Sequence, residues 1–474
     1  MKYLSRIILF LILPCISSLQ AEIKLPAIFS DGMVMQQNTN AVIWGKATPK
    51  EQVTLMASWD KTKIITKADA MGNWKITIPT PKAGGPFTLT ISDGKPFILR
   101  NILMGELWLC SGQSNMEMPM KGFKNQPVEG SNMDILKSTN PNLRLFTVKR
   151  NSTIQAQNDV SGQWQEASPE TVGQFSATGY YFGRLIQETL HVPVGFISSA
   201  WGGSCIEAWM TEDMLRAFPS VKIPKTEKDI KEKNRTPTTL YQAMIHPLVG
   251  LTIKGVIWYQ GETNYDRANT YADMFTTMIK EWRKNWGQKD TIPFYYCQIA
   301  PYDYSIITEK GKEVINSSYL REAQAKVEQT VPATGMAVLL DAGLEKGIHP
   351  VKKQVAGERL ALLALTKSYQ IHGISGESPY YKGIEIKNDT VIVNFERAPM
   401  WISAKNFVSK LFTLAGEDKV FHPAKAWIVR SKMYVKSEAV KKPVAVRYAF
   451  ENYVEGDLYS NEGLPVSSFR SDTW

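Results

Sequence analysis

Three patterns of hydrophobic and polar positions follow one another along this chain. From residue 22 to about 103, short runs rich in β-branched and aromatic residues are separated by Gly, Pro and Asp-Gly turns; clear examples are 41–44, 53–55 and 74–78. Runs of this kind, with no long helical period between them, predict short β-strands. We therefore expect a small N-terminal β-sandwich domain over residues 22–103.

The pattern changes between residues 104 and 374, where apolar strand candidates alternate with amphipathic helices. The strand candidates are 103–109, 194–198, 255–259, 294–299 and 336–340. The strongest helix is expected over 270–286, where five large apolar side chains share one helical face: Tyr271, Met274, Phe275, Met278 and Trp282. Weaker helices are expected at 179–190 and 318–329. This alternation predicts an α/β domain, with a largely parallel sheet covered by helices on both faces.

Two further segments complete the expected organisation. Residues 220–238 are polar and rich in Lys, which predicts a surface insertion. From residue 375 to the end the β pattern returns, with strand candidates at 391–393, 426–429 and 444–446. We expect a second, C-terminal β-sandwich-like region over residues 375–474.

The first 21 residues have the form of an export signal. Lys2 and Arg6 give a basic start, an apolar stretch runs from Ile7 to Pro14, and small or polar residues follow up to Ala21. The apolar stretch is too short to cross a bilayer, and no later apolar run is long enough to do so. We expect the mature protein to be exported, to a periplasm or to the extracellular space, without a membrane span.

Charge and cysteine content exclude several classes of function. The net charge of +10 falls to +8 without Lys2 and Arg6, and it is spread along the sequence with no block of Lys and Arg. A nucleic-acid partner is therefore not expected. The cysteines that remain after residue 21 are Cys110, Cys205 and Cys297; they form no CxxC pair and lie in or beside apolar stretches. We expect buried thiols, not a disulfide framework or a metal site.

Candidate chemistry lies in four loops that follow predicted strands: Ser-Gly-Gln-Ser-Asn at 111–115, Ala-Trp-Gly-Gly-Ser at 200–204, Gln-Gly-Glu-Thr-Asn at 260–264 and Gly-Ile-His-Pro at 347–350. In parallel-sheet folds, ligands bind beyond the carboxyl ends of the strands. Because all four loops are expected at that edge, they are expected to meet there.

The first loop offers a nucleophile. Ser114 is surrounded by small and polar residues that would leave its hydroxyl accessible, although Met116 stands where a GxSxG elbow has its second glycine. Ser204 is the rival candidate. We favour Ser114, because the glycine pair before Ser204 suits a different task, in which backbone N–H groups approach a developing oxyanion closely.

The best candidate for the general base is His349. It follows a predicted strand, Pro350 after it suits the first position of a helix, and Val355, Ala356, Leu360 and Leu363 continue at helical spacing. His246 has an apolar neighbourhood typical of a structural histidine. The remaining histidines lack glycine-rich neighbours and are expected at the surface or in packing roles: His191, His372 and His422.

The third loop carries two amides that could serve an oxyanion. Gln260 and Asn264 are expected at the end of the middle strand, where either could donate a side-chain N–H, and Glu262 between them would orient its neighbours. No zinc-ligand spacing, phosphate-binding loop or dinucleotide fingerprint occurs, so neither a metal nor a nucleotide cofactor is expected.

These loops carry a resemblance to a known family. The blocks "GELWLCSGQSNMEMPM", "SAWGGSCIEAWM", "GVIWYQGETN" and "GIHPVKKQVAGERLA", together with "LPAIFSDGMVMQQ" near the start, resemble the sialate O-acetylesterases of the SGNH hydrolase superfamily. The resemblance implies an SGNH-type α/β fold and hydrolysis of acetyl esters on sugars, typically 9-O-acetyl sialic acid, by a serine esterase. It implies Ser114 as nucleophile, His349 as general base, and an oxyanion hole from the N–H groups of Ser114 and Gly203 with an amide of Gln260 or Asn264.

The chain departs from the family pattern at one place. The family commonly has an aspartate two or three residues before the histidine, where this chain has Gly347 and Lys346. Asp341 and Glu345 are the candidates for the third member of the triad, and a backbone carbonyl oxygen is the alternative.

Three readings of the function follow from these observations. The first is a sialic acid O-acetylesterase, which arginines near the site would favour; the candidates are Arg184, Arg267 and Arg321. The second keeps the mechanism on acetylated xylan or another glycan. The third is a catalytically inactive glycan-binding protein.

Overall fold

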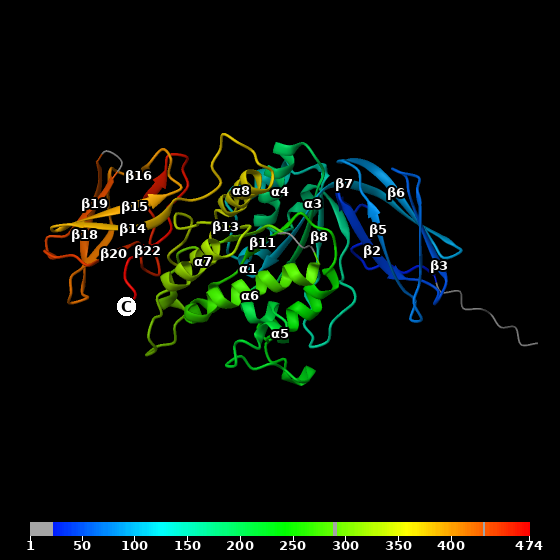
Figure 1. Cartoon of the computed structure of the whole chain (residues 1–474), viewed down its shortest axis with the longest axis horizontal. Coiled ribbons are helices and arrows are strands. Elements are labelled where there is room, and N and C mark those ends of the chain that lie inside the picture. Colours follow the sequence, from blue (N-terminus) through cyan, green and yellow to red (C-terminus); the bar gives the residue numbers. More distant parts are fainter. Residues whose placement is uncertain (1–21, 288–291, 430–431) are drawn as a thin grey trace, which may run out of the picture.

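The structure is a computed structural model that describes residues 22–287, 292–429 and 432–474. It is a mixed α/β protein with an α/β centre between two β regions, one formed by the N-terminal part of the chain and one by the C-terminal part (Figure 1). The expected signal segment, residues 1–21, lies outside the described residues. No helix among the described residues is long and apolar enough to cross a membrane.

A sheet of seven strands forms the centre, in the spatial order β13-β12-β11-β7-β10-β8-β9. Neighbours from β13 to β8 run parallel, and β9 pairs with β8 antiparallel. The strands are β7 (Pro96–Gly112), β8 (Asn140–Thr147), β9 (Trp164–Ala167), β10 (Val194–Ala200), β11 (Gly255–Tyr259), β12 (Phe294–Cys297) and β13 (Thr334–Ala337). Five of these strands overlap the expected positions, although β13 covers 334–337 where 336–340 was expected. β8 and β9 were not expected; β8 opens with Asn-Pro-Asn, which is typical of a turn.

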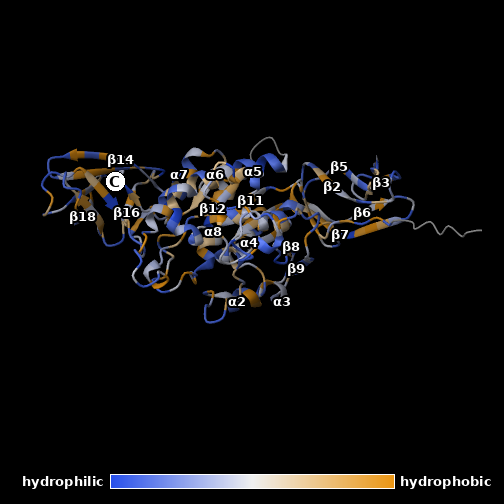
Figure 2. Ribbon diagram, turned by 90° about the horizontal axis from the view of Figure 1, so that it is seen from below, coloured by the Kyte–Doolittle hydropathy of each residue, from blue (hydrophilic) through white to orange (hydrophobic). Residues whose placement is uncertain are grey.

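Side chains of the central strands enter two separate apolar clusters. Leu107, Leu109 and Trp258 pack with side chains of α6 (Ala268–Trp286) and α7 (Ser318–Thr330). Trp108 and Cys110 pack with side chains of α4 (Ala177–Leu190) and α8 (Lys353–Leu363). Each large apolar side chain buried in this way contributes roughly 1.5–3 kcal/mol to stability. Hydrophobic residues accordingly lie along the strands at the centre of the molecule (Figure 2).

Four short helices complete the α/β centre. They are α1 (Ser114–Glu117), α2 (Ser131–Leu136), α3 (Pro169–Val172) and α5 (Glu212–Leu215). A 3₁₀ segment, η5 (Glu262–Arg267), leads into α6.

The N-terminal β region shares its longest strand with the centre. Its strands are β1 (Val34–Gln36), β2 (Asn40–Lys46), β3 (Gln52–Ala57), β4 (Lys63–Lys67), β5 (Asn73–Pro79) and β6 (Gly84–Ser92). β2 pairs with β5, while β6 and β1 pair with the first half of β7. β3 pairs with β6, and β4 pairs with β3. The expected boundary between residues 103 and 104 thus falls inside an unbroken strand. Along β7, side chains that are partly exposed before residue 102 give way to a fully buried run.

The C-terminal region is a seven-stranded antiparallel sheet with one additional strand pair. Its strands are β14 (Tyr380–Lys387), β15 (Thr390–Glu396), β16 (Ile402–Ala404), β17 (Val408–Ala415), β18 (Phe421–Val429), β19 (Lys432–Lys436), β20 (Ala445–Tyr448), β21 (Leu458–Ser460) and β22 (Phe469–Arg470), with β16 paired to β21.

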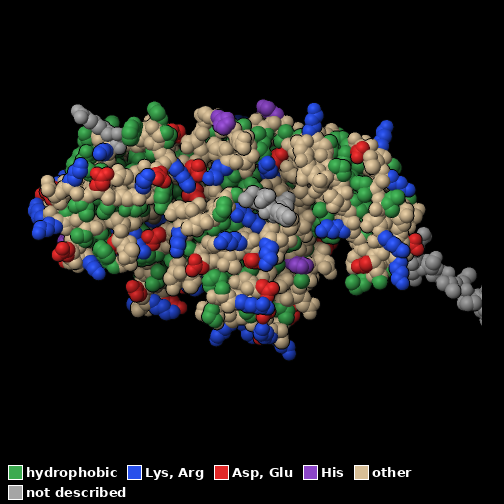
Figure 3. Space-filling view, in the orientation of Figure 1, with side chains coloured by type: hydrophobic (Ala, Val, Ile, Leu, Met, Phe, Trp, Pro, Cys, Tyr) green, Lys and Arg blue, Asp and Glu red, His purple; other side chains and the backbone are tan. Residues whose placement is uncertain are grey.

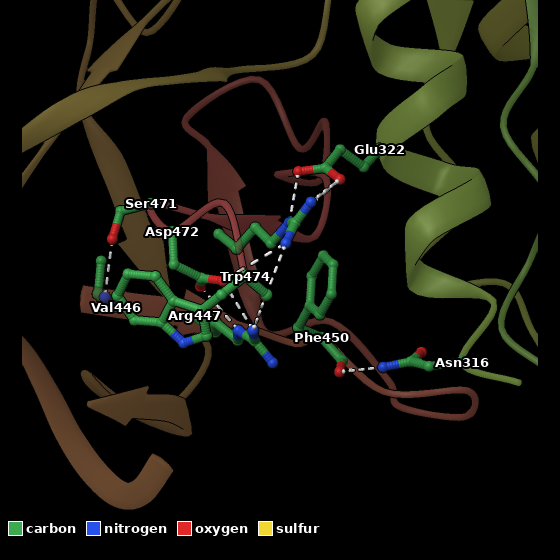
Figure 4. Close-up of polar contacts among 9 residues, drawn as sticks. Asn316, Glu322, Val446, Arg447, Phe450, Ser471, Asp472 and Trp474 are labelled. Carbon is green, nitrogen blue, oxygen red and sulfur yellow. Dashed lines mark hydrogen bonds and ion pairs between the residues drawn. The ribbon is translucent and has the colours of Figure 1, made fainter. Parts of the chain in front are cut away.

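Ion pairs attach the C-terminal region to the centre. Arg470 binds Glu322 of α7, with an Nε–Oε1 distance of 2.9 Å, and Arg397 binds Glu328 of α7 at 2.9 Å. Within the C-terminal region, Arg447 binds Asp472 at 2.7 Å beside the Arg470–Glu322 pair (Figure 4). The fully buried Arg321 of α7 donates to the carbonyl oxygen of Glu451 at 2.5 Å. The position of α7 is therefore tied to both regions.

On the face seen in Figure 3, Lys and Arg side chains are interspersed with Asp and Glu. The modest positive charge of the chain is therefore not gathered into one basic patch on this face.

Candidate active site

Three loops leave neighbouring strands at one edge of the central sheet. Gly112 at the end of β7 is in register with Ala200 of β10 on one side and with Tyr259 of β11 on the other. The backbone of Gly112 has a φ of +136°, and a Cβ at this position would lie 2.2 Å from the carbonyl oxygen of Tyr259. Only glycine fits this close approach, which brings the loops after β7, β10 and β11 together.

Ser114 stands on a loop that is held from both sides. Gln113 donates its backbone N–H to Tyr259 O at 2.9 Å, and its side-chain oxygen accepts the N–H groups of Gly261 and Thr263, each at 3.3 Å. Ser114 is the first residue of α1, and its carbonyl oxygen accepts the N–H of Met118 at 2.8 Å. These bonds fix the backbone of Ser114 at the floor of a cleft that its side chain lines.

His349 lies against Ser114. The distance between His349 Nε2 and Ser114 Oγ is 2.8 Å, and the ring of Phe123 meets the imidazole edge-on at 5.4 Å between centroids. Burial, and secondarily the positive charge of Lys353, lower the pKa of His349 to about 4. The imidazole is therefore neutral near pH 7, as a general base must be. α8 begins at Lys353, so Pro350 precedes the helix and does not occupy its first position.

The partner of the other imidazole nitrogen is not a carboxylate. His349 Nδ1 contacts the side-chain oxygen of Gln126, in a turn where Phe123 and Gln126 exchange backbone hydrogen bonds at 3.0 Å. Because an amide oxygen only accepts, Nδ1 carries the proton in this contact and Nε2 presents its lone pair to Ser114. This role of Gln126 was not predicted, because Gln126 is 223 positions away from His349 and no local pattern links the two residues.

Neither carboxylate expected as third member reaches the histidine. Asp341 forms two hydrogen bonds with Arg359 of α8, at 2.6 and 2.7 Å, and Glu345 is exposed. Arg359 presents the planar, bidentate partner that a carboxylate binds best, which holds Asp341 away from the imidazole.

The two side-chain amides that were expected in an oxyanion hole form hydrogen bonds with other buried groups. Gln260 donates to Ser204 O at 3.1 Å and to Asn264 Oδ1 at 2.7 Å, and Asn264 donates to Glu207 at 3.0 Å. Both side chains are buried, and neither lines the cleft. They hold the second and third loops together. Ser204 is fully buried and accepts a hydrogen bond from Trp209 at 2.9 Å, so it is not a nucleophile facing the cleft.

The glycine pair of the second loop does lie against the serine. A Cβ on Gly202 would be 3.2 Å from the Ser114 Cβ, and Gly203, with a φ of +70°, lines the same cleft. The N–H of Gly202 donates to Glu117 Oε2 at 2.8 Å. A backbone donor to an oxyanion would therefore come from Gly203 or from Ser114 itself.

The cleft has a volume of about 1030 Å³ and a lining rich in charged side chains. Part of its wall comes from the expected insertion, including Lys222 and Arg235, so this segment does more than cover the surface. Each arginine of the lining faces a carboxylate: Arg150 with Glu117 at 2.5 Å, Arg235 with Glu232 at 3.3 Å and Arg267 with Glu207 at 3.5 Å.

Of the three arginines considered from the sequence, only Arg267 lines the cleft. Arg184 pairs with Asp134 at 2.7 Å, and Arg321 is fully buried against the C-terminal region.

His246 and the cysteines have structural surroundings, while His191 and His372 are exposed and His422 is partly exposed. His246 Nδ1 lies 2.8 Å from the carbonyl oxygen of Gln157. The prediction of buried thiols is confirmed, because Cys110, Cys205 and Cys297 are free and buried. In the part of the chain that the structure describes, no group of three or more His, Cys, Asp or Glu side chains is placed to hold a metal ion.

Comparison with known proteins gives consistent results. The family described as carbohydrate esterase, sialic acid-specific acetylesterase, matches residues 104–358. The sialate O-acetylesterase of Homo sapiens is 30% identical over 416 residues, which are 80% of this chain and 78% of that protein. The sialate O-acetylesterase of Mus musculus is 30% identical over 420 residues, 76% of each chain. A crystal structure of a carbohydrate acetylesterase from Xanthomonas citri is similar over 96% of this chain and 100% of that one, with a TM-score of 0.86 and 36% identity.

Proposed function

This chain belongs to the sialic acid-specific acetylesterase family of carbohydrate esterases, and we propose that it removes O-acetyl groups from sugars through an acetyl-enzyme on Ser114, with His349 as general base. It is a carboxylic ester hydrolase by family. The observation that carries the assignment of the residues is the 2.8 Å contact between His349 Nε2 and Ser114 Oγ at the floor of the cleft.

The proposed reaction has two balanced steps. Ser114 Oγ attacks the acetyl carbonyl carbon while Nε2 of His349 takes the hydroxyl proton, and the bond to the sugar oxygen then breaks as that proton passes to the departing sugar. In the second step water loses a proton to Nε2 and attacks the acetyl carbonyl carbon; the bond to Ser114 Oγ then breaks, acetate leaves, and the proton on Nε2 returns to Oγ. The N–H groups of Ser114 and Gly203 would hold the carbonyl oxygen as its negative charge develops.

Gln126 takes the orienting role that an aspartate has in the usual triad. Its side-chain oxygen accepts the Nδ1 proton, which selects the tautomer that the reaction needs. A neutral amide adds no negative charge beside the imidazole, so the imidazolium formed in the first step gains less stabilisation than a carboxylate would give.

Among sugars, we propose 9-O-acetylated sialic acid as the substrate. The family description and Arg267 at the cleft support this choice, since a guanidinium can bind the sialic acid carboxylate. An acetylated neutral glycan such as xylan is the second candidate. The observation in its favour is that each cleft arginine already faces a carboxylate.

The test is acetate release by purified residues 22–474 from 9-O-acetylated sialic acid and from acetylated xylan at equal acetyl concentration, with Ser114→Ala alongside. Release from the sialic acid that the variant abolishes is the expected result. Release from xylan alone would move the proposal to a neutral glycan. A folded protein that releases acetate from neither would favour the inactive glycan-binding protein.

Two further proposals concern the fold type of the central domain and the export of the protein. We propose that the central α/β domain is of the SGNH hydrolase type, which the parallel sheet and the position of Ser114 after β7 support. We also propose that residues 1–21 direct export to a periplasm or the extracellular space. Fractionation of cells producing the full chain, compared with a chain lacking residues 1–21, tests the latter.

A further inference from the structure

A buried chain of three polar side chains lies beneath the Ser114–His349 pair. The ammonium of Lys353 contacts Asn115 Oδ1, and Asn115 Nδ2 donates to Glu262 Oε1 at 2.5 Å and to the carbonyl oxygen of Ile348 at 3.1 Å. Lys353, Asn115 and Glu262 are each less than 5% exposed. Polar groups buried this deeply are costly to a fold unless they are paired, so their presence requires a reason.

The contacts join the two halves of the proposed catalytic pair. Asn115 directly follows Ser114, and Ile348 directly precedes His349. The side-chain amide of Asn115, the residue after the nucleophile, therefore contacts the backbone of Ile348, the residue before the base. The backbone oxygen of Asn115 also accepts a hydrogen bond from Thr178 of α4 at 3.0 Å, which fixes the other side of the residue.

The side chain of Lys353 is almost fully buried, next to ionisable groups. The groups that face it are the Glu262 carboxylate of η5, the Tyr259 ring of β11 at 5.9 Å from Nζ, and the Cys297 thiol of β12. Burial lowers the pKa of Lys353 to about 7, and the carboxylate of Glu262 opposes that shift. Burial in turn raises the pKa of Glu262. Lys353 is not among the residues that line the cleft.

We propose that Lys353 is a positioning residue for the Ser114–His349 pair: its ammonium fixes the Asn115 side chain, and Asn115 sets the spacing between the loop of Ser114 and the loop of His349. This inference rests on the proposed function of these two residues. Burial is the main reason that the imidazole of His349 stays neutral, and the positive charge of Lys353, four residues further along the chain, adds to that effect. The role differs from simple packing, because it predicts an effect on the titration of His349.

The test compares Lys353→Met with the same substitution at its exposed neighbour, Lys352→Met. Both variants lose one positive charge, and methionine keeps much of the length of lysine without its donors. For hydrolysis of 4-nitrophenyl acetate, we expect Lys353→Met to lower kcat by roughly 10–100-fold, the size of effect that a displaced reacting group can cause, with KM changed less than about twofold. Lys352→Met should keep both parameters.

A second measurement does not depend on activity. The pKa of His349 is followed by NMR titration of histidine-labelled protein, with its signal assigned as the one absent from His349→Asn. We expect the His349 pKa to rise in Lys353→Met and to stay in place in Lys352→Met. If Lys353→Met does not fold, as judged by circular dichroism, the double variant Lys353→Met/Glu262→Gln removes both buried charges together and supplies the same comparison.

A folded variant with unchanged kcat and an unchanged His349 pKa would overturn the inference. If the wild-type protein hydrolyses no acetyl ester, the proposed function fails, and the NMR titration alone decides whether Lys353 acts on His349. A shift in pKa without a loss of kcat would also overturn the positioning role, since the charge would then act without holding the geometry.

Discussion

The Nδ1 atom of His349 contacts the side-chain oxygen of Gln126, so a neutral amide supports the imidazole where a carboxylate is usual. The contact fixes the tautomer of the ring. Without a nearby negative charge to favour the imidazolium, burial and the charge of Lys353 act on the ring unopposed, and the pKa of His349 is low.

Replacing Gln126 tests the orienting contact directly. In Gln126→Ala the Nδ1 proton loses its acceptor, and we expect kcat for 4-nitrophenyl acetate to fall by up to about 10²-fold as the imidazole loses its orientation. Gln354→Ala is the matched control, because Gln354 is also an exposed glutamine near the site but bonds Glu358. Equal kcat in the two variants would remove Gln126 from the mechanism.

The reciprocal change, Gln126→Glu, separates orientation from charge. A carboxylate beside Nδ1 stabilises the imidazolium, so the pKa of His349 should rise and the acid limb of the kcat/KM profile should move to higher pH. The comparison is a pH series on wild type and variant under identical salt. An acid limb at the same pH in both proteins would mean that residue 126 does not contact the imidazole of His349 in solution.

The low pKa of His349 predicts activity in unusually acid solution. The imidazole must be neutral to accept a proton, so activity should be present above its pKa and lost as pH falls through about 4, and not near the ordinary histidine value of 6.5. The measurement is kcat/KM from pH 3 to 8, with circular dichroism at each pH to separate protonation from unfolding. A midpoint close to 6.5 in folded protein would contradict this prediction.

Asp341 should matter for stability and not for the chemical step. Asp341→Asn weakens the two bonds to Arg359, and we expect the free energy of unfolding in urea to fall by roughly 1–3 kcal/mol, as for other hydrogen bonds to charged groups. The kcat should change less than about twofold. Glu345→Gln, at an exposed position, should alter neither quantity. A loss of about 10⁴ in kcat for Asp341→Asn would instead restore it as the triad acid.

Replacing Arg267 tests whether the substrate is an acidic or a neutral sugar. If it binds the carboxylate of sialic acid, Arg267→Ala should raise KM for 9-O-acetylated sialic acid by roughly 10–100-fold, the equivalent of one charged hydrogen-bonded contact, and leave KM for 4-nitrophenyl acetate unchanged. Arg184→Ala, away from the cleft, is the control. An equal KM for the acidic sugar in wild type and Arg267→Ala would favour a neutral glycan.

The periodic parts of the fold were accessible from local sequence. The helix expected over 270–286 is α6 (Ala268–Trp286), and the strand expected over 255–259 is β11, because a dense apolar face or a short buried run specifies its element without distant partners. β8 was missed, since its Asn-Pro-Asn start looks like a turn until β10 and β9 pair with it on either side. The end of the N-terminal region was also not predictable, because it lies inside β7, a single strand that pairs first in the N-terminal region and then in the central sheet.

What the sequence determined by itself was the list of groups capable of the chemistry: a serine among small residues after one strand, a histidine after another, and glycines between them. What only the tertiary structure decided was which groups meet. Gln126 reached His349 and Asp341 did not, while Gln260 and Asn264 turned toward each other and away from the cleft. Spacing along the chain reports on neighbours within one element, but a side chain's partner across the fold depends on competing donors and acceptors, here Arg359 for Asp341 and Glu207 for Asn264.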